Sequence, residues 1–215
     1  MDYTKLIDFL YEENLQYNLT GIKEKKDMYT KHILDSLFLS DYITINNLAN
    51  KELLDIGTGA GFPAIVLAKE LLNIKVFALD SVRKKTLFVD KVINKFKIAN
   101  LFSHCDRVET YALQNKNRFS LVTARSVAGL NVLLEYAAPL LMKGGSLLAM
   151  KSIEIEEELL CSKETQTLTG LEFCGNFSYT LSDQKRHILA FRKINEPEVC
   201  LPRKIGLAKN QPLRR

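Results

Sequence analysis

The 215-residue sequence contains no tryptophan, only three histidines and four cysteines, and no long apolar run that is free of charge. The cysteines lack the close pairing of zinc or redox motifs, and no histidine lies at a ligand spacing from a cysteine or another histidine. We therefore expect no metal site and no disulfide framework. The most apolar stretch, residues 124–150, is interrupted by Arg125, Asn131, Glu135 and Lys143, so we expect no membrane-spanning helix.

The first residues, Met1 to Lys5, do not begin the basic and apolar pattern of a secretion signal. We therefore expect a cytoplasmic protein. Hydrophobic residues make up 47% and charged residues 26% of the chain, a composition that excludes a disordered or low-complexity polypeptide. At this length we expect one domain with extensions.

Basic residues gather near both ends of the chain, although the net charge is only +5. One cluster lies within residues 23–31, and residues 185–215 hold nine lysines and arginines against Glu196 and Glu198. Both ends of the chain could therefore meet phosphate groups.

The pattern along the chain predicts an α/β fold. Residues 1–50 show apolar side chains at helical spacing and predict a helical extension, in which a second helix opens with Asp27 as its N-cap. Over residues 51–195 short apolar strands alternate with helices, which is typical of a parallel sheet covered on both faces. A polar turn over residues 182–185 indicates that the last two strands form an antiparallel hairpin. We therefore predict a Rossmann-like sheet of seven strands.

The expected elements are these. Strands are predicted over residues 53–56, 74–79, 101–104, 119–123, 146–150, 171–181 and 187–194. Helices are predicted over residues 83–97, 108–114 and 130–141, and another begins at Pro63. Gly144 and Gly145 are expected to form the turn before the fifth strand.

A glycine-rich loop follows the first predicted strand. Gly57, Gly59 and Gly61 are spaced two apart, so the chain can turn tightly and bring bare backbone against a ligand. Phe62 stands where the dinucleotide fingerprint needs its third glycine, which excludes that motif. Asp80 ends the next strand, where a carboxylate can accept both ribose hydroxyls of an adenosine. Together these residues predict a site for S-adenosylmethionine, although a plain strand-to-helix turn is the simpler alternative.

Two further strand ends bear on the chemistry. After the third strand, Val108 and Glu109 could read the adenine edge with a backbone amide and a carboxylate. After the fourth, residues 123–126 carry neither the Pro-Pro-aromatic loop of amine methyltransferases nor the nucleophilic cysteine of base-C5 enzymes. The acceptor is therefore expected to need neither amine alignment nor covalent activation.

At this point the sequence resembles a specific family, the bacterial small-subunit rRNA guanine-N7 methyltransferases, also called glucose-inhibited division protein B. The resemblance covers nearly the whole chain and implies the seven-stranded methyltransferase sheet. Its motifs here are residues 18–20, 31–36, 55–63, 79–81, 107–109, 124–126, 150–151, 186–187 and 202–206. Ala124, Ser152, Ala64 and Val66 depart from the usual pattern, and we expect them to reshape the pocket slightly.

The resemblance implies S-adenosylmethionine as methyl donor and a guanine in the 530 loop of 16S rRNA, or of the small ribosomal subunit, as acceptor. We expect the protein to act as a monomer. The cofactor contacts that the resemblance implies are Gly57, Phe62, Val108, Glu109 and Arg125, which join Gly59, Gly61 and Asp80 from the loop analysis. The candidate RNA contacts are Thr20, His32, Lys151, Arg186, Arg203 and Lys204. We expect the basic tail, residues 196–215, to form a rigid arm that contacts rRNA phosphates, with a merely solvated tail as the alternative. If it is such an arm, removing the residues after Leu201 lowers RNA affinity and spares cofactor binding.

Guanine N7 carries a lone pair and no proton, so its methylation needs no general base and no catalytic residue is predicted. Arg125 is a permanent cation that could hold the donor carboxylate, guanine O6 or a phosphate; a surface ion pair is its alternative. His32 could equally pack in the core, and Lys151 could be a solvated ammonium. Two other functions remain open: methylation of a small molecule, and a non-catalytic role in ribosome assembly.

Overall fold

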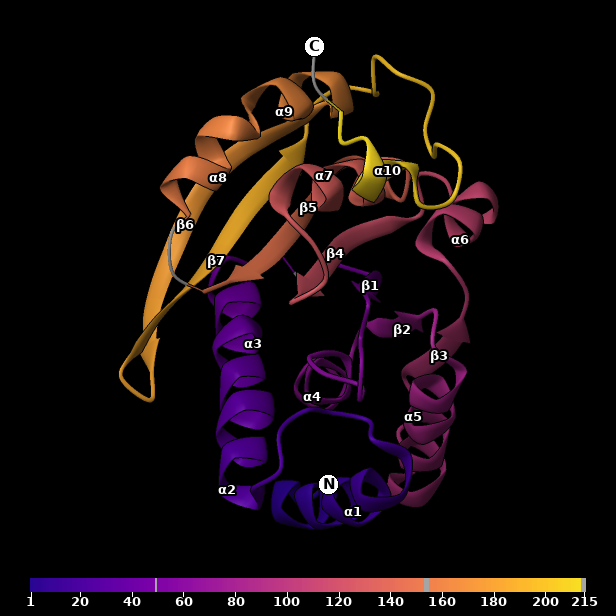
Figure 1. Cartoon of the computed structure of the whole chain (residues 1–215), viewed down its shortest axis with the longest axis vertical. Coiled ribbons are helices and arrows are strands. Elements are labelled where there is room, and N and C mark those ends of the chain that lie inside the picture. Colours follow the sequence, from indigo (N-terminus) through magenta and orange to yellow (C-terminus); the bar gives the residue numbers. More distant parts are fainter. Residues whose placement is uncertain (49, 153–154, 214–215) are drawn as a thin grey trace.

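The computed structural model describes residues 1–48, 50–152 and 155–213 and has one seven-stranded sheet at its centre (Figure 1). The strand order is β3-β2-β1-β4-β5-β7-β6. The first five strands of this order run parallel, and β7 pairs antiparallel with both β5 and β6. The strands are β1 (Glu52–Ile56), β2 (Lys75–Asp80), β3 (Leu101–Cys105), β4 (Phe119–Arg125), β5 (Leu141–Lys151), β6 (Leu171–Leu181) and β7 (Gln184–Lys193). This architecture confirms the predicted α/β class and the terminal hairpin.

Helices cover both faces of the sheet because its strands alternate apolar side chains between two cores. Leu53 packs in one hydrophobic cluster and Leu54 in the other. The helices of the first face are α1 (Tyr3–Tyr17), α2 (Lys25–Met28), the π-helix η1 (Tyr29–Leu34), α3 (Asp35–Ile45), α4 (Ala64–Glu70) and α5 (Arg83–Phe96). Later in the chain come α6 (Val108–Gln114), α7 (Leu130–Ala137), α8 (Glu156–Cys161), α9 (Lys163–Thr169) and α10 (Leu207–Asn210).

Several predicted boundaries are wrong. The last strand begins at Gln184 rather than at residue 187, so the hairpin turn is shorter than the predicted residues 182–185. The helix expected to reach Leu141 ends at Ala137, because Pro139 lacks the amide hydrogen that would continue the helical hydrogen bonds. Leu141 instead begins β5 opposite Phe119. Gly144 and Gly145 therefore lie inside β5, at a shift in its register with β4. At Gly145 a Cβ would approach the carbonyl oxygen of Phe119 to 3.1 Å, so the close strand approach requires glycine.

The second helix also starts earlier than predicted. Its first residue is Lys25, so Asp27 is not the N-cap but lies in the first turn. Its carboxylate forms an ion pair with Lys31 one turn later, at 3.0 Å. The helix then continues through the wider π-helical turn of η1, a feature that hydrophobic spacing alone does not reveal and that often lies at functional sites.

The described residues contain no helix that is both long and apolar enough to cross a membrane. All four cysteines are exposed free thiols.

Lys193 fastens the end of β7 to the segment that joins α7 and β5. Its side chain is fully buried, and its ammonium donates to Asn117 Oδ1 at 2.7 Å and to the carbonyl oxygens of Ala138 and Leu141 at 3.1 and 3.0 Å. Glu196 supplies a counter-charge at 3.1 Å. A buried ammonium with four partners holds the antiparallel half of the sheet in register with the parallel half.

We predict that Lys193→Ala lowers the free energy of unfolding by about 2–4 kcal/mol, because two buried carbonyls and a carboxylate lose their donor. Arg192→Ala is the matched control: it removes the preceding basic side chain, which is exposed, and should change stability by less than about 0.5 kcal/mol. Urea unfolding of both variants checks this, and equal effects would contradict it.

Candidate functional site

The glycine loop joins β1 to α4 at the carboxyl end of the sheet. Gly57, Gly59 and Gly61 all have positive φ, at 66°, 62° and 89°. A Cβ on Gly57 would come within 2.6 Å of Val127 Cγ2, so no other residue fits there without displacing the loop after β4. The amides of Gly61 and Phe62 both donate to the carbonyl oxygen of Thr58, which closes the turn. The glycines therefore shape a tight loop beside the strand ends.

Asp80 stands at the end of β2, next to this loop. Its Oδ2 accepts from the amide of Gly59 at 2.9 Å and its Oδ1 from the amide of Val82 at 2.9 Å. Lys85 lies 3.7 Å from Oδ2. Because each carboxylate oxygen can accept two hydrogen bonds, one acceptor position remains on each oxygen. Asp80 thus fixes the loop and keeps the capacity to bind a diol.

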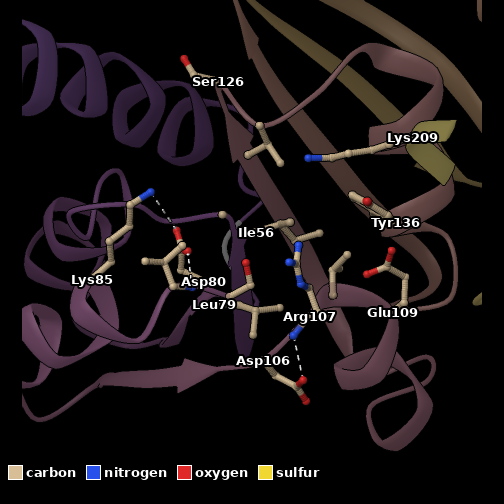
Figure 2. Close-up of a pocket in the computed structure, with 15 residues that line it drawn as sticks. Ile56, Leu79, Asp80, Lys85, Asp106, Arg107, Glu109, Ser126, Tyr136 and Lys209 are labelled. Atoms are coloured by element: carbon tan, nitrogen blue, oxygen red, sulfur yellow. Dashed lines mark hydrogen bonds and ion pairs between the residues drawn. The ribbon is translucent and has the colours of Figure 1, made fainter. Parts of the chain in front are cut away.

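A cavity of about 240 Å³ opens between the ends of β2, β3 and β4, and we call it the Asp80 cavity (Figure 2). It lies beside β1 and β4, where the strand order reverses direction and where open α/β sheets bind ligands. The residues that line it are Ile56, Gly57, Leu79, Asp80, Ser81, Val82, Lys85, Asp106, Arg107, Val108, Glu109, Ser126, Val127, Tyr136 and Lys209. The lining combines apolar side chains with three acidic and three basic ones, a combination that suits a purine and its ribose.

Glu109 lies in the first turn of α6 and is buried. Its Oε1 accepts a hydrogen bond from the amide of Gly206, 97 positions later, at 2.8 Å. Tyr136 faces the same carboxylate; burial first, and Glu109 second, raise the pKa of this phenol to about 12. The predicted adenine-edge residues therefore border the Asp80 cavity, and the C-terminal segment holds one of them.

Arg125 ends β4 and joins the N-terminal helices to the glycine loop. Its Nη1 donates to the carbonyl oxygen of Lys31 at 2.8 Å and to Asp35 Oδ2 at 3.0 Å. Its Nη2 donates to the carbonyl oxygen of Phe62 at 3.4 Å. The ion pair with Asp35 is mostly buried, with side chains 13% and 7% exposed. Arg125 therefore forms a mostly buried ion pair, not a surface one, and its guanidinium has several hydrogen-bond partners.

His32 completes this connection. Its ring stacks on Phe62 with centroids 4.7 Å apart and planes 8° apart. Nη2 of Arg125 lies 3.1 Å from His32 Nδ1, and because arginine only donates, Nδ1 accepts. Nε2 therefore carries the proton and donates to Thr20 Oγ1 at 3.2 Å. Burial, and then the charge of Arg125, lower the pKa of His32 to about 3, so the ring is neutral near pH 7.

Asp55 is a fully buried acid on β1 below the loop. Thr123 donates its hydroxyl to Asp55 Oδ1 at 2.9 Å. Burial raises the pKa of Asp55 to about 6, while the nearby hydroxyls of Thr58 and Thr123 and the charge of Arg125 act in the opposite direction.

Two more cavities adjoin the first. The His32 cavity, of about 340 Å³, shares Gly57, Lys85 and Ser126 with the Asp80 cavity and is also lined by Thr20, His32, Phe62 and Arg125. The Lys151 cavity, of about 180 Å³, shares Asp35, Arg125, Ser126 and Arg186 with the His32 cavity. Ser126, with φ of 56°, lines all three. All the predicted cofactor residues except Gly61, and four predicted RNA residues, thus border adjoining cavities.

Lys151 is only 14% exposed and is not a solvated ammonium. Its Nζ donates to Glu158 Oε1 at 2.7 Å and to the carbonyl oxygen of Ala128 at 3.0 Å. The same Glu158 oxygen accepts from the amide of Leu130 at the start of α7. This pair holds the loop between β4 and α7. Arg186 borders the His32 and Lys151 cavities, and its Nε is buried without a hydrogen-bond partner among the described residues.

The tail does not project as an arm in its described part. Arg203 is paired with Glu135 at 2.5 Å, and Leu201 and Ala208 are buried beside α7. Lys204 is exposed and lies outside the three cavities. Arg214 and Arg215, which the sequence analysis included in the basic tail, lie outside the described residues.

Several residues to which sequence reasoning gave no place in the site also border these cavities, among them Lys85, Ser126, Tyr136, Tyr179 and Lys209. Lys85 follows Asp80 by five positions and Ser126 follows Arg125, so neighbouring motifs could have drawn attention to both. Lys209 was predicted only as part of the basic tail, and no local pattern marks Tyr136 or Tyr179. Tyr179 on β6 donates to Asp35 Oδ1 at 2.7 Å and thereby ties the hairpin to the Arg125 pair. Within the described residues no cluster of histidine, cysteine and acidic side chains could hold a metal ion.

Comparison with known proteins identifies close relatives over almost the whole sequence. The family described as rRNA small subunit methyltransferase G matches residues 2–189. Proteins named ribosomal RNA small subunit methyltransferase G from Desulfitobacterium hafniense and Bacillus subtilis are 38% and 35% identical over 210 residues. Each alignment covers 96% of this chain, and 86% and 87% of the respective relatives.

Solved structures share the fold at low sequence identity. Magnesium protoporphyrin IX methyltransferase from Synechocystis, solved with bound S-adenosylmethionine, superposes with a TM-score of 0.64 at 13% identity, covering 90% of this chain and 98% of that one. A 16S rRNA (adenine(1408)-N(1))-methyltransferase from Catenulisporales acidiphilia gives a TM-score of 0.56 at 14% identity, covering 73% and 91%. Both establish the likeness of fold.

We predict that Arg125 and Asp35 are energetically coupled. In a double-mutant cycle of Arg125→Gln and Asp35→Asn, each single change leaves a mostly buried partner without its counter-charge. The double variant should therefore be more stable than the sum of the two single effects implies, by about 1–3 kcal/mol in the free energy of unfolding. Additive effects, measured by urea unfolding, would contradict the buried pair.

The lowered pKa of His32 predicts a pH-dependent stability. Unfolded histidine binds a proton below about pH 6.5, whereas the folded ring does so only near pH 3, so this stabilisation is lost as pH falls between these values. From pH 7 to pH 5 the wild-type protein should lose about 2 kcal/mol of unfolding free energy that His32→Gln does not lose.

The unfolding free energies of the two proteins must be subtracted at each pH, because the titration of Asp55 changes stability in the opposite direction. Its raised pKa makes stability fall as pH rises from about 4 to 6, and that contribution is common to both. Urea unfolding at pH 7 and pH 5 provides the measurement. A stability difference between wild type and His32→Gln that does not change with pH would show that His32 is not a buried neutral ring.

Proposed function

Because the chain belongs to the rRNA small subunit methyltransferase G family, we propose that it transfers a methyl group from S-adenosylmethionine to N7 of a guanine in the 530 loop of 16S rRNA. The observation that carries the proposal is the family match over residues 2–189, which spans the glycine loop, Asp80 and Arg125. Because its proposed substrate is ribosomal RNA, we propose that the protein acts in the cytoplasm. We also propose that it acts as a monomer.

The residues around the Asp80 cavity fit an adenosine. Asp80 keeps an acceptor position on each carboxylate oxygen for the ribose hydroxyls, and Val108 and Glu109 border the place of the purine. Gly57 exposes its backbone between this cavity and the His32 cavity. The amino acid end of the donor would lie in the His32 cavity. S-adenosylmethionine supplies an electrophilic methyl group on a sulfonium.

The protein's part in the reaction is to orient the two reactants and exclude water. A guanine N7 has no proton to lose, so no side chain needs to act as a base. Arg125 is balanced by Asp35 and His32 is neutral, so neither adds an unbalanced positive charge beside a sulfonium. Thr20, Lys151 and Arg186 border the cavities on the acceptor side, where hydroxyl, ammonium and guanidinium groups suit a base and its phosphate. Holding N7 in line with the methyl group is the main source of rate enhancement.

We predict that the protein transfers labelled methyl groups from S-adenosylmethionine to undermethylated small ribosomal subunits or their 16S rRNA. Nuclease mapping should place the label in 7-methylguanosine within the 530 loop. Asp80→Asn should lower kcat/KM at least about tenfold, because one ribose acceptor becomes a donor. Asp41→Asn is the matched control, since Asp41 is an exposed acid on α3 outside the three cavities.

Each alternative gives a different result in this assay. Label in a small molecule of a metabolite extract, with none in RNA, would indicate a small-molecule methyltransferase. Donor binding without transfer to any substrate would indicate a non-catalytic assembly factor. Label in a nucleotide other than 7-methylguanosine would overturn the proposed acceptor atom while leaving an RNA methyltransferase.

A further inference from the structure

The C-terminal segment, residues 201–210, packs along α7 beside α6 (Figure 1). Leu201 and Ala208 are 6% and 1% exposed and belong to the hydrophobic cluster that also contains Leu134 of α7. The segment is therefore part of the folded core, although its composition suggested an arm for RNA.

A mostly buried ion pair anchors the start of this segment. Arg203 donates from Nε to Glu135 Oε1 at 2.7 Å and from Nη2 to Glu135 Oε2 at 2.5 Å. Glu135 is only 3% exposed, so its carboxylate depends on this bidentate partner. Arg203 also donates to the carbonyl oxygen of Gln211 beyond α10, which closes the segment on itself.

A second contact joins the segment directly to the wall of the Asp80 cavity. The amide of Gly206 donates to Glu109 Oε1, and φ of 79° at Gly206 turns the chain into α10. This turn places Lys209 among the residues that line the cavity. In Figure 2 its amine points into the cavity from the side away from Asp80. Lys209 has no hydrogen bond or ion pair within the part of the chain that the structure describes.

We propose that residues 201–210 form a wall of the donor site and that Lys209 is a donor-binding residue. This inference rests on the proposed function, in which the ribose meets Asp80. The purine then lies between Asp80 and the Glu109 side of the cavity, where Lys209 supplies an ammonium. Adenine offers ring nitrogens that accept hydrogen bonds, so an unpaired ammonium is a suitable partner.

The same contacts couple docking of the segment to donor binding, so each of the two strengthens the other. A donor that contacts Lys209 binds more tightly when the segment is docked, so it must also stabilise docking by the same factor. The sequence predicts that removing the tail spares donor binding. The contacts at Glu109 and Glu135 instead favour a tail on which donor affinity depends.

The test compares donor binding to Lys209→Met and Lys143→Met in the full-length protein without RNA. Both changes remove one exposed lysine charge, but Lys143 lies on β5 and lines none of the three cavities. Calorimetric titration with S-adenosylmethionine and S-adenosylhomocysteine should show about five- to tenfold weaker binding to Lys209→Met alone. Binding unchanged from wild type, or weakened equally in both variants, would overturn the role of Lys209.

Two further measurements separate this inference from the proposed function. S-adenosylhomocysteine should slow hydrogen exchange of the Gly206 amide in the wild-type protein, and unchanged exchange would overturn the coupling. Asp80→Asn is titrated in parallel. Weaker binding to Asp80→Asn with normal binding to Lys209→Met would reject the inference and leave the donor site in place. Normal binding to Asp80→Asn would reject the donor site itself, and with it the wall.

Discussion

The arrangement of the site depends on one guanidinium group. Arg125 projects from the end of β4 and donates to acceptors on the π-helix, on α3 and on the glycine loop. The first two acceptors lie on the continuous helical stretch of η1 and α3, and the third lies in the loop between β1 and α4. Because the charge is mostly buried, it can remain there only while Asp35 stays beside it. The helical extension is therefore fixed relative to the glycine loop, and the wall that carries Thr20 and His32 is part of the site.

The central strands could be predicted closely from the sequence because they are buried on both faces. Mostly apolar runs such as residues 53–56 and 74–79 are typical of such strands, and the structure puts β1 and β2 within one residue of them. The ends of helices were harder to predict, because apolar residues continue past them. From Leu130 to Leu141 the apolar pattern hides the change from helix to strand, which Pro139 and pairing with Phe119 decide.

The candidate site could be predicted where its residues are local to one turn. Gly57, Gly59 and Gly61 follow from the backbone geometry of a tight turn, and Asp80 follows from its place at a strand end. The rest depends on contacts between distant segments. Asp35 lies 90 positions from Arg125, and Gly206 lies 97 from Glu109. No periodicity encodes such pairs, so a basic tail looked like an arm for RNA, although Arg203 is held by Glu135.

In the proposed function the donor lies at the junction of three segments: the glycine loop, the N-terminal helices and the C-terminal segment. A structure with S-adenosylhomocysteine bound tests this most directly. We predict the ribose on Asp80, the purine between Asp80 and Lys209, and the sulfur facing the cavity bounded by His32 and Arg125. A ligand seated elsewhere, or one whose sulfur faces away from His32 and Arg125, would contradict the account.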